Sequence, residues 1–185
     1  MSQPAQAQQK DKVVFPKGLK WQTMHFAAFD ASPGVYKETV SDAEKKLAAQ
    51  IWKKEIDENP EKNIDGTKLS SEVLIYQFSD DNSSHTFTIL NIPFQNGCTP
   101  PGDDWRPDAL YSLCPMRLVV EDKNNQKVST RNFPKQCIMH MDDKDTPLRE
   151  NHTEIAWDSP NSTVYFRIFQ YGKHIPACDK VIHIE

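Results

Sequence analysis

The stretch EVLIYQFSDDNSSHTFTILNI, residues 72–92, decides the fold class of this chain. Two runs rich in β-branched and aromatic residues stand on either side of a polar segment of Ser, Asp and Asn. This arrangement is typical of two antiparallel strands joined by a turn. In the first run Leu74 and Tyr76 alternate with Val73 and Ile75, so both faces of the strand are apolar. A strand of this kind is usually buried on both sides.

The same pattern continues on both sides of this stretch. Two further segments combine β-rich runs with a central polar turn, and in the first of them Asn124-Asn125 tolerates the positive φ that a tight turn needs. Two shorter segments read as single strands. The predicted hairpins span 116–133 and 153–171, and the single strands span 19–29 and 180–185.

One segment near the start, residues 41–57, has the pattern of an amphipathic helix. Ser41 and Glu44 have the spacing of a capping box, and apolar residues recur at helical spacing before Asn59-Pro60 ends the pattern. The order of elements therefore predicts a mainly β fold. We expect an antiparallel β-sandwich or barrel-like domain with this N-terminal helix packed on it, held by two disulfides.

Composition limits both the number of domains and the class of partner. A chain of 185 residues is long enough for one well-packed domain, which we place at residues 13–185, after a disordered tail at 1–12. The formal net charge of −4 argues against a nucleic-acid binder, which would show a basic face. No apolar run approaches the length of about 18 residues that a membrane span requires.

The N-terminus and the cysteines both point to export. Ala5-Gln6-Ala7, followed by a polar stretch, fits the end of a secretory signal, although an ordinary polar tail fits equally well. The four cysteines are widely spaced and form no C-x-x-C pair, which favours structural disulfides over a zinc or redox site. Four cysteines allow three pairings, of which we predict Cys98–Cys114 and Cys137–Cys178. The predicted location is the periplasm or the extracellular space, with four free cytosolic thiols as the alternative.

Residues 135–145, KQCIMHMDDKD, allow three interpretations. On a regular strand Met139 and Met141 share one face with Cys137, whereas His140 points to the other face. Thioethers with an imidazole suit Cu(I), but a copper site would then need a histidine from elsewhere in the fold. The acidic end lacks the spacing of a calcium-binding loop and reads as a turn. We therefore predict a disulfide-anchored strand that runs into a turn, with no metal and no organic cofactor.

The loop at residues 95–114 is the segment most suited to recognition. It places Trp105, Arg106 and Tyr111 between two cysteines that we predict to be paired, and these three residue types are enriched in binding hot spots. A stapled loop also loses little entropy when it binds. The competing interpretation is a covering flap in which Trp105 and Tyr111 close one end of the sandwich.

These patterns favour an exported, non-catalytic binding module that recognises a protein partner. Its role would be that of an inhibitor, an immunity protein, a component of a secretion apparatus or a virulence accessory. The chain has no nucleophile elbow, no H-E-x-x-H and no phosphate-binding glycine loop, so no catalytic residues are predicted. The first alternative is an exported copper-binding protein that uses Met139 and Met141 with a histidine. The second is a secreted hydrolase whose site is assembled from scattered residues.

Overall fold

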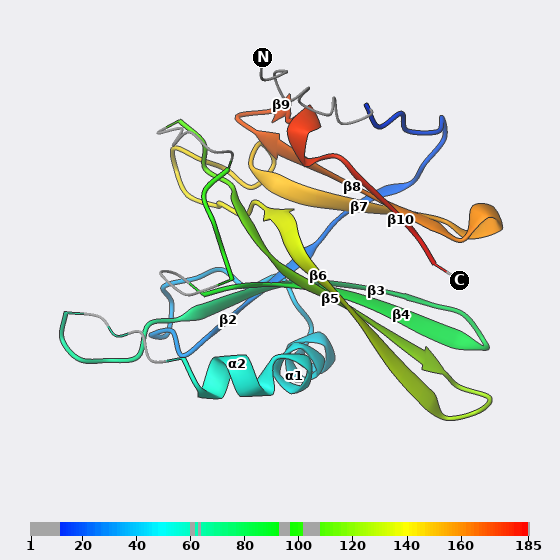
Figure 1. Ribbon diagram of the computed structural model, residues 1–185. Helices are drawn as coiled ribbons and strands as arrows, with labels where there is room; N and C mark the ends of the chain where they lie inside the picture. Colours follow the sequence, from blue (N-terminus) through cyan, green and yellow to red (C-terminus); the bar gives the residue numbers. More distant parts are fainter. Residues whose placement is uncertain (1–11, 60–61, 63, 93–96, 102–107, 185) are drawn as a thin grey trace, which may run out of the picture.

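The computed structural model describes residues 12–59, 62, 64–92, 97–101 and 108–184. Within these residues the chain forms two antiparallel sheets of five strands each, and two helices lie against one of them (Figure 1). The prediction of a mainly β fold with antiparallel pairing is therefore confirmed. Apart from Lys12, the expected disordered tail at 1–12 falls outside the described residues.

The first sheet is built from consecutive strands in the order β2-β3-β4-β5-β6. The stretch at 72–92 supplies its central hairpin, in which Glu72 pairs with Asn91 at one end and Ser79 with Ser84 at the other. The longest pairing joins β5 to β6, and its register shifts between Cys114 and Met116. The strands are β2 (His25–Phe29), β3 (Ser71–Ser79), β4 (Ser83–Asn91), β5 (Ser112–Asp122) and β6 (Lys127–Ile138).

The second sheet combines the start of the chain with its end. Its order is β1-β7-β8-β10, and the short strand β9 also pairs with β8. Here the predicted hairpin at 153–171 forms the β7–β8 pair. The strands are β1 (Trp21–Thr23), β7 (His152–Asp158), β8 (Thr163–Gln170), β9 (Lys173–His174) and β10 (Lys180–His183).

The chain passes between the two sheets at two places. Only Met24 separates β1 in the second sheet from β2 in the first, so the expected strand at 19–29 is shared by both sheets. After β6 the chain leaves the first sheet, and His140 forms an isolated antiparallel bridge with His152 at the start of β7. The two crossings lie close together, because Met24 N donates to the carbonyl of Thr153 and Met139 N donates to Thr153 Oγ1.

The main core lies between the sheets and draws apolar side chains from both. Phe87 of β4 meets Phe166 of β8 edge to face, with ring centroids 5.6 Å apart. Alternation along each strand directs these residues inward. The fully buried members include Met24, Leu74, Phe87, Ile89, Met116, Leu118, Ile155, Val164 and Phe166.

The helical segment predicted at 41–57 is divided at Trp52 into α1 (Asp42–Ile51) and α2 (Lys53–Asp57). The capping box forms as expected, since Glu44 N donates to Ser41 Oγ and Ser41 N donates to Glu44 Oε1. At the break Trp52 is only 2% exposed and packs with Ala48 against the outer face of the first sheet. Arg117 of β5 donates from Nη1 to the carbonyl of Ile51 at 2.8 Å.

Two disulfides connect the cysteines as predicted. Cys98 pairs with Cys114 and Cys137 pairs with Cys178, with Cα atoms 4.1 Å and 5.6 Å apart. Stable disulfides of this kind are typical of extracellular and periplasmic proteins. In the described part of the chain, both helices are too short to cross a bilayer.

Candidate functional site

The loop at 95–114 is closed at its base by a disulfide and by backbone pairing. Thr99 and Leu113 exchange two hydrogen bonds, of 2.8 and 2.9 Å, beside the Cys98–Cys114 bond. Trp105 and Arg106, two of the three residues predicted to bind a partner, lie outside the described residues. Their role in recognition stays a prediction.

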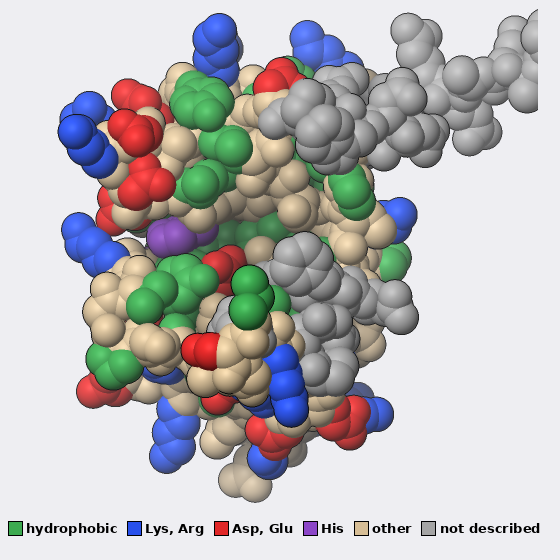
Figure 2. Space-filling model, turned by 90° about the vertical axis from the view of Figure 1, so that its left-hand side faces the viewer, with side chains coloured by type: hydrophobic (Ala, Val, Ile, Leu, Met, Phe, Trp, Pro, Cys, Tyr) green, Lys and Arg blue, Asp and Glu red, His purple; other side chains and the backbone are tan. Residues whose placement is uncertain are grey.

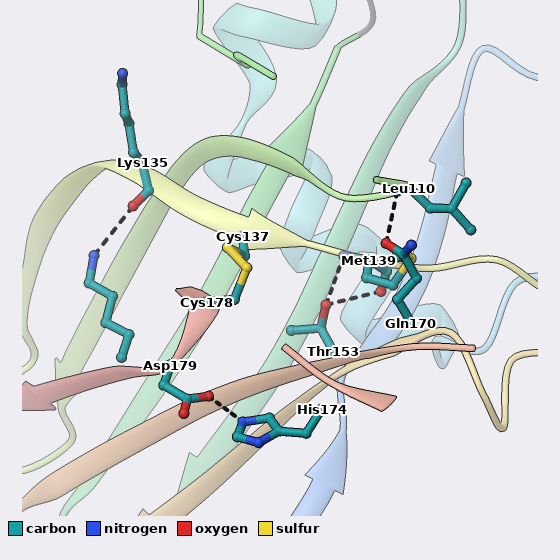
Figure 3. Close-up of a disulfide and its surroundings, with 10 residues drawn as sticks. Leu110, Lys135, Cys137, Met139, Thr153, Gln170, His174, Cys178 and Asp179 are labelled. Carbon is teal, nitrogen blue, oxygen red and sulfur yellow. Dashed lines mark hydrogen bonds and ion pairs between the residues drawn. A yellow bond between two sulfur atoms is a disulfide. The ribbon is translucent and has the colours of Figure 1, made fainter. Parts of the chain in front are cut away.

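Tyr111, the third predicted partner-binding residue, is only 9% exposed. It packs in a small apolar cluster with Met139, Ile168 and the Cys137–Cys178 disulfide. Next to it Leu110 N donates to the side-chain oxygen of Gln170 at 2.9 Å (Figure 3). This position gives Tyr111 a packing role, as the covering-flap interpretation expects.

The methionines and the histidine of residues 135–145 have different surroundings. Met139 is buried in the Tyr111 cluster, where its backbone N–H donates to Thr153 Oγ1 and its carbonyl accepts from the same hydroxyl, both at 2.9 Å (Figure 3). His140 lies on the other side of the chain, stacked on Phe26. Among the described residues no group of three or more His, Cys, Asp or Glu side chains could hold a metal ion.

The acidic end of the same segment forms a turn. The carboxylate of Asp143 accepts hydrogen bonds from the backbone N–H groups of Asp145 and Thr146 at 2.8 and 2.7 Å. This is the local side-chain-to-backbone bonding for which Asp is favoured in turns. The turn brings Asp142 and His140 to the edge of a cavity.

This cavity, with a volume of about 270 Å³, is the candidate functional site. It lies where β2 and β3 meet the turn after β6 and the loop that joins β2 to α1. Figure 2, which faces this side of the molecule, shows a hollow across its middle with histidine and acidic side chains at the edges. The lining residues are Phe26, Val35, Tyr36, Lys37, Glu72, His140, Met141, Asp142 and Asp143.

Aromatic rings form one wall of the cavity. The imidazole of His140 stacks on Phe26 with centroids 3.9 Å apart and planes within 2°. The ring of Tyr36 lies 5.9 Å from Phe26 at an angle of 50°. Tyr36 and its neighbour Val35 are 37% and 62% exposed, so the rim carries apolar side chains that face solvent.

The lining also contains three carboxylates. Burial raises the pKa of Glu72, and hydrogen bonds from Asn91 and Tyr36 offset part of this effect. Asn91 Nδ2 donates to Glu72 Oε2 at 3.1 Å. The lining also holds Asp142 and Asp143, and its one basic residue, Lys37, lies 3.6 Å from Asp142 with its own side chain 79% exposed.

Burial also determines the charge of His140. It lowers the pKa of this imidazole from 6.5 to about 4, against the opposing influence of Asp142. The ring is therefore neutral at pH 7. A neutral aromatic wall facing several carboxylates suits a cationic group, because both the π-faces and the carboxylates attract positive charge.

A second polar cluster lies on the outer face of the other sheet. Arg167 Nε lies 2.5 Å from one oxygen of Glu154, and His152 Nε2 lies 2.9 Å from the other. The Arg167 guanidinium also stacks 4.0 Å from the ring centroid of Trp21. Burial raises the pKa of Glu154, but its bonds to His152 and Arg167 bring that pKa below its usual value. Because the cluster joins β1, β7 and β8, holding these strands together explains its geometry.

Sequence reasoning missed the two residues that define the cavity. Neither Glu72 nor Tyr36 was singled out in the sequence. Their contact depends on a loop that folds back over a strand 36 positions later in the chain. His140 was considered within residues 135–145, but only as the residue that points away from the two methionines.

No protein-family model matches this chain, and no match was found among the curated proteins or the solved structures.

Proposed function

We propose that this protein is an exported, non-catalytic binding module that recognises a protein partner by taking a cationic group of that partner into the Glu72–His140 cavity. The observation that carries the proposal is the lining itself. Three aromatic rings and three carboxylates line a space of about 270 Å³. Aromatic faces with nearby carboxylates are the usual surroundings of bound lysine, arginine and quaternary ammonium groups.

The rim supports a protein partner as the source of the cation. Val35 and Tyr36 are exposed apolar side chains directly beside the opening. Tyr is enriched at interface hot spots, where an anchor enters a pocket and apolar neighbours exclude water around it. When a basic side chain of the partner enters the cavity, the partner's backbone would contact this rim.

Export is supported by the two disulfides, which form and persist in oxidising compartments. The described lining offers no serine, threonine or cysteine as a nucleophile. His140 stacks on Phe26, and the Glu72 carboxylate accepts a hydrogen bond from Asn91. These features favour binding over the alternatives of copper handling and hydrolysis.

Calorimetric titration of the oxidised protein tests the cavity. The ligands are tetramethylammonium, N-acetyl-lysine methyl amide and its uncharged analogue N-acetyl-norleucine methyl amide. We expect both cations to bind with dissociation constants on the order of millimolar, as small ligands with few contacts do. The norleucine analogue should not bind measurably. Glu72→Gln and Tyr36→Ala should each weaken the cations, whereas Glu121→Gln, on the far hairpin, should not.

Photo-crosslinking tests the partner. A photoreactive amino acid replaces Val35, and crosslinks are collected in the producing organism. A specific protein crosslink that disappears with excess tetramethylammonium supports the proposal. If norleucine binds as tightly as lysine, or if Glu72→Gln binds the cations unchanged, the cavity is not a cation site and the proposal fails.

A further inference from the structure

A second cavity, larger than the first, lies between the outer strands of the two sheets. Its volume is about 550 Å³. Its lining comes mainly from residues 135–137 at the end of β6 and residues 177–181 around the start of β10, with Val13 and Leu113 completing it. The Cys137–Cys178 disulfide connects its two sides (Figure 3), and Lys180 Nζ donates across it to the carbonyl of Lys135. We call this space the β6–β10 groove. In the first sheet β6 is at the edge opposite β2, so the groove and the Glu72–His140 cavity involve opposite edges.

The groove contains a buried side-chain amide with no hydrogen-bonding partner. Gln136 lines it and is 1% exposed, yet neither Oε1 nor Nε2 is bonded to any group of the described chain. Native proteins pair the large majority of buried polar side-chain atoms, because an unpaired one carries its full desolvation penalty. An amide offers two donors and one acceptor. The matching ligand group is therefore another amide, which also donates and accepts.

Both strands beside the groove have an open edge. In the described chain β6 pairs only with β5, and β10 pairs only with β8. The two edges are connected by side chains: Arg131 Nη1 donates to the carbonyl of His183 at 3.0 Å, and Lys180 Nζ to that of Lys135 at 3.4 Å. Backbone N–H and C=O groups along an open edge are a template for another strand. The buried, unpaired amide of Gln136 and the open edges of β6 and β10 therefore match the backbone of an extended polypeptide.

We propose that the β6–β10 groove binds an extended peptide segment of a partner protein, which adds as a strand along the edge of β6 and pairs a main-chain amide with Gln136. The basic side chains Arg131, Lys135 and Lys180 lie along this edge, whereas the carboxylate of Asp179 is bonded to His174 at 2.6 Å. The groove therefore favours a segment that carries Asp or Glu. Main-chain pairing gives affinity in such strand addition, and alternate side chains give specificity.

The test uses a defined probe, a ten-residue peptide of alternating valine and glutamate with a fluorescent label. Anisotropy measures its binding to the full oxidised protein, and hydrogen exchange locates it. We expect slower exchange along β6 and β10. Gln136→Met keeps the size and removes the amide, so it should weaken the peptide tenfold or more and raise the denaturation midpoint of the free protein. Gln50→Met, on the exposed face of α1, is the matched control and should change neither.

Two peptide controls separate strand addition from charge attraction. Methylation of alternate backbone nitrogens removes the donors and should abolish binding, while lysine in place of glutamate should weaken it. Equal binding by the N-methylated peptide, or by Gln136→Met, would overturn the inference, as would protection confined to other strands. Glu72→Gln should bind the peptide normally, so failure of this inference and failure of the cation cavity are distinguishable.

Discussion

Glu72 and His140 share one cavity, and burial shifts their protonation in opposite directions. Burial disfavours the charged form of either group, so the pKa of Glu72 rises while that of His140 falls to about 4. Each group is thereby moved toward its neutral form. A cation bound in the cavity would favour the ionised form of the Glu72 carboxyl, whereas the His140 imidazole would stay uncharged.

His140→Phe should remove part of the acid sensitivity of the fold. In the unfolded chain His140 takes up a proton near pH 6.5, but in the folded chain it does so only near pH 4. Wild type therefore loses stability as pH falls through this window, because the unfolded state binds more protons there. Phenylalanine keeps the stack on Phe26 and does not titrate.

Urea denaturation at pH 7 and pH 4.5 measures this difference. Between these values the wild type should lose about 2 kcal/mol more than His140→Phe, after allowance for partial solvent screening. Asp142, His152 and Glu72 are present in both proteins, so the comparison isolates the contribution of the His140 imidazole. Parallel pH dependence in the two proteins would show that the folded imidazole titrates normally.

Single residues were the hardest feature to predict from the sequence. The predicted cysteine pairing was correct, although spacing alone allows three pairings. The burial of Glu72 and the unpaired amide of Gln136 could not be predicted, because each depends on chain segments far away in the sequence. Their local neighbours read as ordinary strand residues.

At the scale of elements, one arginine connects the helices to the sheet beneath them. Arg117 projects from β5, bonds to both carboxylate oxygens of Glu55 and to the carbonyl of Ile51, and stacks 4.1 Å from the ring centroid of Trp52. Burial raises the pKa of Glu55, but these bonds bring it below its usual value. The break between α1 and α2 is thus held by a strand residue.

Arg117→Lys should destabilise the protein although it keeps the charge. Lysine cannot bond both carboxylate oxygens and the Ile51 carbonyl at once, nor can it stack flat on Trp52. We expect a loss of about 1–3 kcal/mol in the free energy of unfolding, because the arginine bonds are charge-assisted and partly buried. Arg131→Lys, at an exposed single hydrogen bond, should cost less than about 0.5 kcal/mol. Equal losses in the two variants would contradict this assignment.

The elements themselves were predicted well where they depend on local sequence. The hairpins at 72–92, 116–133 and 153–171 formed because alternation and turn residues act over a few positions. The capping box formed for the same reason. The division of the helix at Trp52 was missed, since its partner Arg117 comes from a strand 65 residues later.

At the scale of the whole molecule, the two disulfides differ in what they join. Cys98–Cys114 closes a loop beside the first sheet, across a separation of 16 residues. Cys137–Cys178 links the end of β6 in the first sheet to the segment before β10 in the second, across 41 residues. The sequence predicted the pairs but not this difference, which depends on how strands are shared between sheets.

Removing each disulfide in turn should reveal the difference. By loop-closure entropy, replacing Cys98 and Cys114 with alanine should cost about 3 kcal/mol, and replacing Cys137 and Cys178 about 4 kcal/mol. Denaturant titration of both variants gives the ranking. The second variant should also lose protection from hydrogen exchange along β10, whereas the first should keep it. A larger loss of stability in the Cys98/Cys114 variant would show that this disulfide restrains the fold more than Cys137–Cys178 does.

The two crossings between the sheets set an order of events during synthesis. Strands β2 to β6 occupy an unbroken segment, residues 25–138, whereas the second sheet needs β1 from the start and β7 to β10 from the end. Synthesis proceeds from the N-terminus, so all strands of the first sheet are available before β7, the partner of β1, has been made. Cys137 emerges opposite Leu113, beside Cys114, long before Cys178 exists. If Cys98 closes with Cys114 before Cys137 emerges, Cys137 meets no free thiol of this chain until Cys178 follows.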